Sequence, residues 1–270
     1  MNDLKKYIDN ILSDETKSVD ERIEEVMALR DRSEETEKSE RLAKDRIIFQ
    51  SLFEMLNELP GNERDVEKIQ LLTLLAETMV GQRDYRHLKY VSEETLDILR
   101  DEQIEWDILE QAIPRIADAL EYSYYFHDLY EILLRYMRKA IAEGVELSDI
   151  EDEAEMVVRL KILITDYYDN YLFDDKIRKA LAEIFSSEKL IDIISRPDPG
   201  HLRRDPVEYT DKWEEIIYDA EEELDRRFAN HRKGMGFCFM YWNAKQDLLK
   251  EKYGIEWRSP SQMNPRVMFD

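Results

Sequence analysis

The sequence has few of the residues that make tight turns and disulfides. Seven glycines and seven prolines make up about 5% of the 270 residues, against roughly 12% in an average protein. This scarcity argues against β-sandwiches, β-barrels and Rossmann-like folds, which need hairpin turns or glycine-rich loops. The single cysteine, Cys238, excludes an intramolecular disulfide and fits a reducing cytosol.

Long apolar runs are also missing. The longest, residues 237–242, has six residues, whereas a membrane-spanning helix needs about 20. The first ten residues mix lysines with aspartates and contain no apolar stretch typical of a signal peptide. We therefore expect a cytoplasmic location and no membrane partner.

Positive charge is in deficit over most of the chain. The sequence has 39 Lys and Arg against 62 Asp and Glu, a net charge of −23. Such a chain is a poor candidate for nucleic-acid binding, which depends on clustered basic residues, so we expect no nucleic-acid partner. Residues 226–270 differ, with nine basic residues against four acidic ones. The opposite signs predict that this C-terminal part lies against the acidic remainder.

The pattern that is present is helical. Apolar residues recur every three or four positions almost throughout, and the hydrophobic fraction of 43% is sufficient for a core. Ser18 and Ser148 are expected to be helix N-caps, and Gly144 is expected to follow the last residue of a helix. A turn is expected at Gly81. Pro114 is expected to kink or break its helix. The pattern predicts one helix immediately after Ser18. It predicts further helices over residues 2–12, 40–58, 65–80, 85–99, 102–120, 122–142, 148–168, 174–185, 188–194, 209–229 and 236–252.

A change of composition near residue 195 divides the chain. Residues 1–194 are predicted to form a helical-repeat body. Residues 195–270 hold nine of the fourteen glycines and prolines and are predicted to form a connector, two helices and an extended tail, all within one continuous domain. The tail contains Ile255, Trp257 and Met268 and is too apolar to be free in solvent. We expect it to pack on its own chain, with binding to a partner as the alternative.

One stretch of helices has a repeat-like spacing. Leu72, Leu75 and Ala76 stand at the packing positions of one helix hairpin, and Trp106 and Leu109 stand at those of the next. Residues 69–136 thus resemble the tetratricopeptide repeat, a 34-residue helix hairpin. The resemblance implies an all-α array of antiparallel helix hairpins, bent into an α–α superhelix with an irregular C-terminal tail. It also implies a groove that binds a peptide or a partner protein.

Aromatic residues are the candidates for that binding. Tyrosine offers a large contact area and one polar group, and aromatic side chains are enriched at interaction hot spots. Packing between neighbouring hairpins is the alternative role for the same side chains. The candidate partner-binding residues are Tyr85, Trp106, Tyr122, Tyr125 and Tyr130.

Two histidines and two aspartates point to a different chemistry. His87, the doublet His127-Asp128 and Asp166 follow one another at intervals of about 40 residues. Their order resembles that of the all-helical HD-domain phosphohydrolases. The resemblance implies that the four side chains converge on a divalent metal that activates water against a phosphate ester. Alternatively, His127 is a neutral, hydrogen-bonded histidine within an aromatic core.

Other catalytic signatures are missing from the sequence. It has no His-Glu-x-x-His, no Gly-x-Ser-x-Gly and no Walker loop, and we expect no cofactor. The sequence therefore favours a non-enzymatic cytoplasmic adaptor that binds a peptide or partner protein. The alternatives are a metal-dependent phosphohydrolase and a structural helical domain without a binding site.

Overall fold

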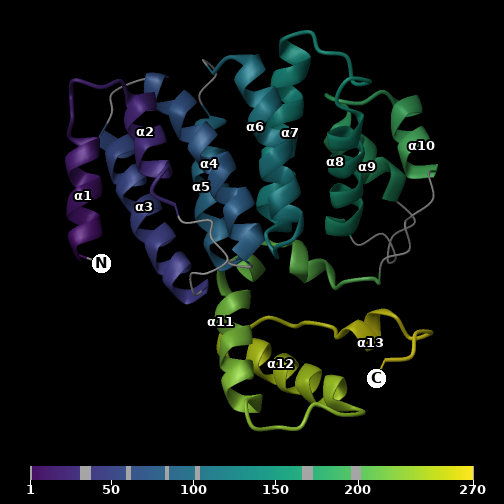
Figure 1. Cartoon of the computed structure of the whole chain (residues 1–270). Coiled ribbons are helices and arrows are strands. Elements are labelled where there is room, and N and C mark those ends of the chain that lie inside the picture. The colour runs from purple at the N-terminus through teal and green to yellow at the C-terminus, as the bar shows by residue number, and fades with distance from the viewer. Residues whose placement is uncertain are drawn as a thin grey trace.

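The structure is a computed structural model that describes residues 2–30, 38–58, 62–82, 85–100, 104–165, 173–195 and 202–269. All regular structure in these ranges is helical and none is a strand, so the predicted all-α class is confirmed (Figure 1). No helix in the described ranges combines the length and apolar character needed to cross a lipid bilayer.

Two groups of helices follow one another along the chain. The first, which we call the body, contains α1 (Asn2–Leu12), α2 (Val19–Met27), α3 (Lys38–Glu58), α4 (Asn62–Gln82), η1 (Tyr85–His87), α5 (Leu88–Ile98), α6 (Trp106–Glu121), α7 (Phe126–Ala142), α8 (Glu151–Ile164), α9 (Phe173–Leu181) and α10 (Ser187–Ser195). The second, the C-terminal unit of residues 202–269, contains η3 (Pro206–Tyr209), α11 (Asp211–Phe228), α12 (Phe237–Tyr253) and α13 (Pro260–Met263).

Local sequence explains several helix ends. The hydroxyl of Ser18 accepts a hydrogen bond from the backbone N–H of Glu21, and the Glu21 carboxylate accepts one from the N–H of Ser18. This capping box begins α2. At the end of α7, Gly144 has φ 81°, a left-handed conformation that glycine adopts without strain. Both predicted caps are confirmed.

Two other predicted helix ends are wrong, and the break that was one alternative at Pro114 is absent. Ser148 does not cap α8, which begins three residues later with no side-chain cap. Helix α6 runs through Pro114, and α4 continues past Gly81 to its last residue, Gln82. A proline inside a helix removes one backbone hydrogen bond. Apolar residues are buried on both sides of Pro114, so packing holds the helix together there.

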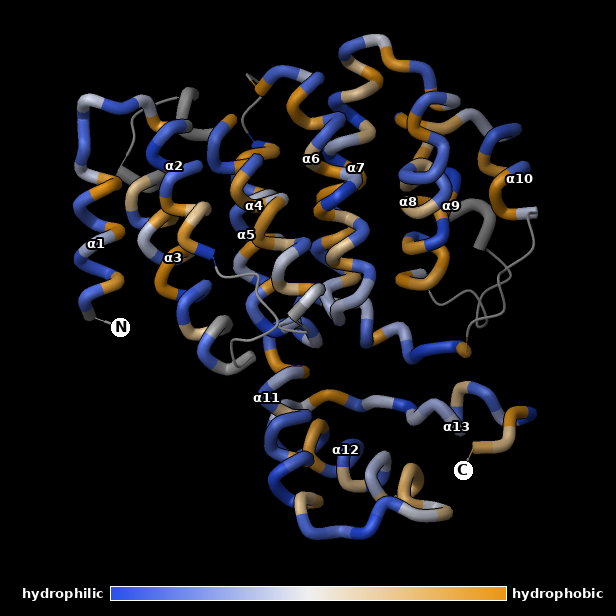
Figure 2. The backbone as a smooth tube through the Cα atoms, in the orientation of Figure 1, coloured by the Kyte–Doolittle hydropathy of each residue, from blue (hydrophilic) through white to orange (hydrophobic). Residues whose placement is uncertain are grey.

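The body is built from stacked helix pairs. Helix α4 packs on α6 and α5 packs on α7, and within each pair α4 contacts α5 and α6 contacts α7 (Figure 1). Fully buried leucines such as Leu72, Leu88 and Leu133 lie in one apolar core that extends from α1 to α10. Figure 2 shows apolar and hydrophilic stretches alternating along these helices, as expected for helices with one face on the core.

The C-terminal unit has its own small core. Helices α11 and α12 pack together, and the fully buried Trp213 lies 6.2 Å from Trp257, measured between ring centroids. The Lys245 ammonium lies 5.1 Å from the centre of each of these two rings and 2.9 Å from the Glu221 carboxylate. Figure 1 shows α11, α12 and α13 below the body, and the unit contacts the body through η3, which packs on α7 and α8, and through α11, which packs on α7.

The tail after α12 folds back on the rest of this unit. Ile255 and Trp257 are buried, and the Trp257 indole N–H donates to Glu208 at 2.7 Å. The Asn264 side chain accepts from the N–H of Arg203 and donates to its carbonyl, both at 2.8 Å. The tail is not wholly extended as expected, because α13 interrupts it with a single capped turn.

Candidate functional site

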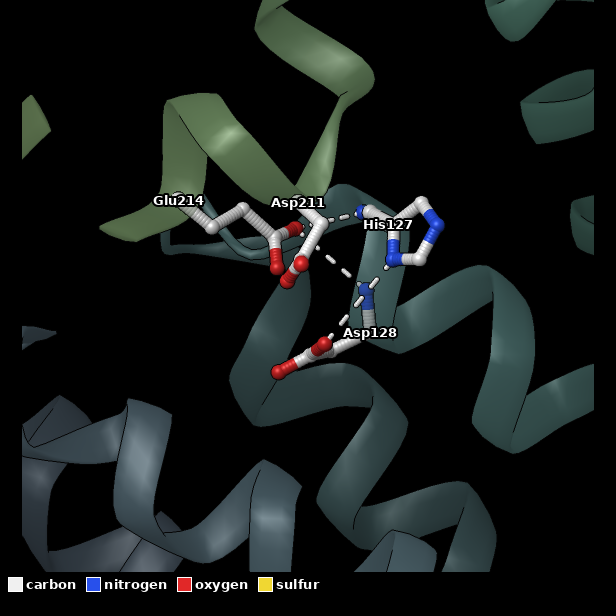
Figure 3. Close-up of side chains that lie close together, drawn as sticks. All are labelled: His127, Asp128, Asp211 and Glu214. Atoms are coloured by element: carbon white, nitrogen blue, oxygen red, sulfur yellow. Dashed lines mark hydrogen bonds and ion pairs between the residues drawn. The ribbon is translucent and has the colours of Figure 1, made fainter. Parts of the chain in front are cut away.

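The first turns of α7 and α11 meet where the body joins the C-terminal unit. Helix α7 contributes His127 and Asp128, and α11 contributes Asp211 and Glu214 (Figure 3). One side-chain N or O atom from each of the four residues lies within 4.8 Å of the others. Together with Lys89 of α5, we call these residues the junction cluster. Carboxylates at a helix N-terminus are stabilised by the helix macrodipole.

Glu214 connects the two helices directly. Its carboxylate accepts hydrogen bonds from the backbone N–H groups of His127 and Asp128, the second at 3.3 Å. The N-cap residue of α7, Tyr125, makes no side-chain cap of its own. Glu214 of α11 therefore satisfies backbone donors that α7 cannot satisfy from its own sequence. The Glu214 side chain is fully buried.

Lys89 lies among the carboxylates. Its ammonium is 2.9 Å from Asp128, 3.2 Å from Glu214 and 3.6 Å from Asp211. Ser92, one turn along α5, donates a further hydrogen bond to Asp128. A half-buried ammonium beside carboxylates is well compensated, and the buried carboxyls Asp128 and Glu214 gain a cationic neighbour.

The two buried carboxyls respond to this environment in opposite ways. Burial raises the pKa of Glu214, and the nearby Asp128 charge raises it further, to about 8. Burial also acts to raise the pKa of Asp128, but the neighbouring His127 imidazole and the hydrogen bonds from Ser92 and Lys89 outweigh it and hold this pKa at about 2. Asp128 is thus the permanent anion of the junction cluster, while Glu214 gains a proton readily.

His127 is the imidazole of the junction cluster, and its side chain is 35% exposed. The neighbouring Asp128 carboxylate raises the pKa of His127 more than burial lowers it. Nδ1 lies 4.0 Å from this carboxylate, an ion-pair distance rather than a hydrogen bond. Among the described residues, no group hydrogen-bonds to this buried Nδ1.

The donor atoms of the cluster suit a divalent metal, but their arrangement does not favour one. Imidazole and carboxylate groups are ordinary ligands of Zn²⁺, Mn²⁺ and Fe²⁺. However, the Lys89 ammonium is within ion-pair distance of three of the four ligand residues. A metal bound there would face a buried positive charge, so Lys89 itself is the cation that this cluster holds.

The metal set expected from the sequence is only partly assembled. His127 and Asp128 belong to the junction cluster, whereas His87 is exposed in η1 and lies outside it, and Asp166 lies outside the described residues. Asp211 and Glu214 were missed because they are more than 80 positions from the doublet. No motif in the sequence signals their approach.

The aromatic candidates for a groove do not share an exposed surface. Tyr125 and Tyr130 are buried in the core of the body, and the Tyr125 hydroxyl donates to a backbone carbonyl of η1. Tyr85 and Trp106 are half-buried against the same core, and Trp106 stacks on another tyrosine. Only Tyr122 is largely exposed, at 67%. Packing between hairpins therefore occupies most of these side chains.

A different group of apolar side chains is exposed, at the start of α12 and the end of the tail. Met235 is 97% and Met268 is 96% exposed. The Trp242 ring joins the two segments, because its centroid lies 5.5 Å from that of Phe239 and 5.2 Å from that of Phe269. We call this group the C-terminal apolar surface; it consists of Met235, Phe239, Met240, Trp242, Val267, Met268 and Phe269.

Three exposed basic residues adjoin this surface in the sequence. Arg232 and Lys233 precede Met235, and Arg266 precedes Val267. None of the three forms an ion pair with any described carboxylate, in contrast to most lysines and arginines of the body. We call Arg232, Lys233 and Arg266 the basic rim.

An open groove of 540 Å³ runs beside α11 and is lined mostly by charged residues. Of its two basic residues, Arg86 and Arg226, the first comes from the body and pairs with Asp219 and Glu222 of α11. The groove is therefore part of the contact between the body and the C-terminal unit.

Comparison with known proteins identifies no relative of this chain. No protein-family model matches it, and no curated protein or solved structure is significantly similar to it.

Proposed function

We propose that the chain is a non-enzymatic, cytoplasmic interaction protein that binds a partner protein on its C-terminal apolar surface. One observation carries this proposal: the segment from Met235 into α12 and the end of the tail both expose apolar side chains, and the Trp242 ring joins these two segments through Phe239 and Phe269. Single exposed apolar residues are common on proteins, whereas a contiguous apolar group marks an interaction site.

The pattern of α12 supports this proposal. Residues 237–242 are apolar or aromatic on every side of the helix, and such a helix is normally covered on every side. One side is covered here, since Phe237 packs against Phe228 of α11. The other side is not, since Phe239 and Met240 are 43% and 42% exposed. A partner protein would cover this second side.

The body has a supporting role in this proposal. Its contacts, α4 on α6 and α5 on α7, are those expected if the helix hairpins form an array similar to tetratricopeptide repeats, and we propose that arrangement. The burial of Tyr125 and Tyr130 moves the proposed binding surface from a groove of the body to the C-terminal unit.

A metal-dependent phosphohydrolase is the alternative proposal. The convergence of His127, Asp128 and two further carboxylates favours it. The Lys89 ammonium opposes it, because it already neutralises the charge that would attract a metal.

Site-specific photo-crosslinking tests the main proposal. A photoreactive p-benzoylphenylalanine replaces either Phe239 or, as the matched control, Ile191 of α10, which is 51% exposed. After irradiation in cells, we expect one reproducible protein partner to be joined at position 239 and absent at position 191. Equal labelling at both positions, or none at position 239, contradicts the proposal.

A further inference from the structure

We infer that the partner presents an acidic amphipathic helix to the C-terminal apolar surface, an inference that rests on the proposed function. Three features lead to it. They are the side-chain composition of this surface, the positive charge of the basic rim, and the negative charge of the rest of the chain.

The composition of the surface favours a helical partner. Three of its seven residues are methionines, Met235, Met240 and Met268. Methionine is unbranched and flexible, and surfaces that accept apolar side chains of different shapes use it often. An amphipathic helix presents such side chains as a ridge at positions i, i+3, i+4 and i+7. Stacked nucleobases, by contrast, are bound mainly by exposed aromatic rings.

The charge beside the surface favours acidic flanks on that helix. Arg232, Lys233 and Arg266 are exposed, and no described carboxylate pairs with any of them. The first turn of α12 contains no acidic residue, and the positive end of its macrodipole adds to the same local potential. Carboxylates on either side of an apolar ridge would complement this potential and fix the orientation of the helix.

The charge of the rest of the chain argues against an anionic membrane as the occupant. Residues 1–201, which precede the C-terminal unit, contain 27 basic and 48 acidic residues. A bilayer is an extended surface and would also meet the repulsion of the acidic body beside the C-terminal unit. A single helix is only about 10 Å wide and would interact mainly with the basic rim, since salt screens charges beyond about 8 Å.

A second copy of the chain is also a poorer occupant. In a two-fold symmetric dimer, the same surface of each copy would face its equivalent. Two basic rims would then face each other, and contact between like charges is unfavourable.

Fluorescence anisotropy with designed peptides tests the inference on the full-length protein. The probe is a labelled helical peptide of about 18 residues, or five turns, with Leu along one face and Glu on both flanks. Its twin carries Lys in place of every Glu, and a third peptide has the acidic sequence scrambled. We expect the acidic peptide to bind at least about tenfold more tightly than its Lys twin, and the scrambled peptide to bind weakly.

Two variants locate the binding. Met235→Asp combined with Met268→Asp changes residues that are almost fully exposed, so the fold is retained while we expect peptide binding to be lost. Ile191→Asp is the matched control.

Arg232→Glu combined with Lys233→Glu is expected to reverse the preference for the acidic peptide, so that the Lys twin binds better. Lys179→Glu, an exposed position on α9, is the control for charge reversal and leaves the preference unchanged.

The inference is overturned if the protein binds the acidic peptide and its Lys twin equally well. It is also overturned if the protein binds neither peptide. Sedimentation of the protein with phosphatidylserine vesicles, or dimerisation that Met268→Asp abolishes, would assign the surface to a membrane or to a second copy. The cross-linking experiment tests the proposed function separately from this inference. A protein partner that cross-links at position 239 supports the proposed function even when the acidic peptide does not bind.

Discussion

At the scale of single residues, Lys89 and Glu214 determine the properties of the junction cluster. The Glu214 side chain is completely buried and that of Lys89 is 19% exposed. The Lys89 charge and the buried Glu214 carboxyl are hydrogen-bonding partners, and removing either one leaves the other without that partner. The two residues are therefore expected to be more sensitive to substitution than the exposed ion pairs of the chain.

Substitution of Lys89 tests whether its ammonium occupies the position in the junction cluster that a metal ion would otherwise take. Lys89→Ala leaves three carboxylates and His127 facing a vacated position, and we expect a loss of about 3 kcal/mol of stability or more. Zn²⁺ is expected to raise the melting temperature of this variant but not of the wild type, because only the variant has an unneutralised ligand set. Differential scanning fluorimetry with and without ZnCl₂ measures both effects.

The control for the zinc effect is Lys89→Ala combined with His127→Ala, which removes one ligand and is expected to lose most of the stabilisation. Stoichiometric metal binding by the wild-type protein would instead favour the phosphohydrolase alternative.

The raised pKa of Glu214 predicts a loss of stability with rising pH. Its pKa is about 8 in the folded protein, against an ordinary value of 4.5. Between these values the folded state holds a proton that the unfolded state has lost. Its stabilisation is complete below the unfolded pKa and disappears as the pH rises through the folded pKa. We expect a decrease of roughly 3 to 4 kcal/mol between about pH 5 and pH 8.

Urea unfolding across this range checks the prediction, with Glu214→Gln as the diagnostic variant. Glutamine keeps the hydrogen-bond acceptor for α7 but cannot ionise, so we expect a shallower decline. The remaining slope belongs to His127, whose raised pKa acts in the same direction. Identical slopes for wild type and variant would show that Glu214 titrates normally.

At the scale of elements, the tail after α12 has two parts with different exposure. Its first part carries Ile255 and Trp257, which are buried against α11 and α12. Its last part carries Val267 and Met268, which are exposed. Both parts are apolar in sequence. The first part serves the core of the C-terminal unit, and the last part belongs to the proposed binding surface.

Two truncations separate these roles. Ending the chain after Gly254 removes Ile255 and Trp257 and uncovers Trp213, so we expect a clear decrease in melting temperature from the lost apolar burial. Ending it after Asn264 removes only the exposed part and leaves the melting temperature nearly unchanged. Thermal unfolding followed by circular dichroism measures both. Similar melting curves for the two truncated chains would mean that the first part does not stabilise the unit.

At the scale of the whole molecule, two apolar cores are joined by aromatic and polar contacts. The core of the body and the core of the C-terminal unit are separate clusters. Tyr218 of α11 contacts the aromatic rings of Tyr124 and Tyr125, and the junction cluster lies close by. The body therefore depends on the C-terminal unit for the cap of α7 and for the carboxylate partners of Lys89 from α11.

Deletion of residues 202–270 tests this dependence. The shortened chain keeps its apolar core but loses the Glu214 cap on α7 and one buried partner of Lys89. We expect the isolated body to fold and to melt at a lower temperature than the full chain. Scanning calorimetry of both chains measures the difference. An unchanged melting temperature would show that the body is independent of the junction cluster.

Much of the local structure was predictable from the sequence, because its causes are local. Helical periodicity and the scarcity of glycine predicted the all-α class, and Ser18 and Gly144 predicted two helix ends. At Pro114, packing overrode the local preference for a break, and α6 continues through the proline. The prediction failed at Ser148, where the chain turns before α8 without using the cap.

The candidate sites were much less predictable, because their residues meet only through the packing of distant helices. The sequence by itself determined helices, an acidic body and a basic, apolar C-terminal end. Only the tertiary structure brought Lys89 to Glu214, 125 positions away, and decided that Trp257 is buried while Met268 is exposed. Helix formation follows from spacing along the chain, whereas burial and charge pairing depend on which helix faces meet.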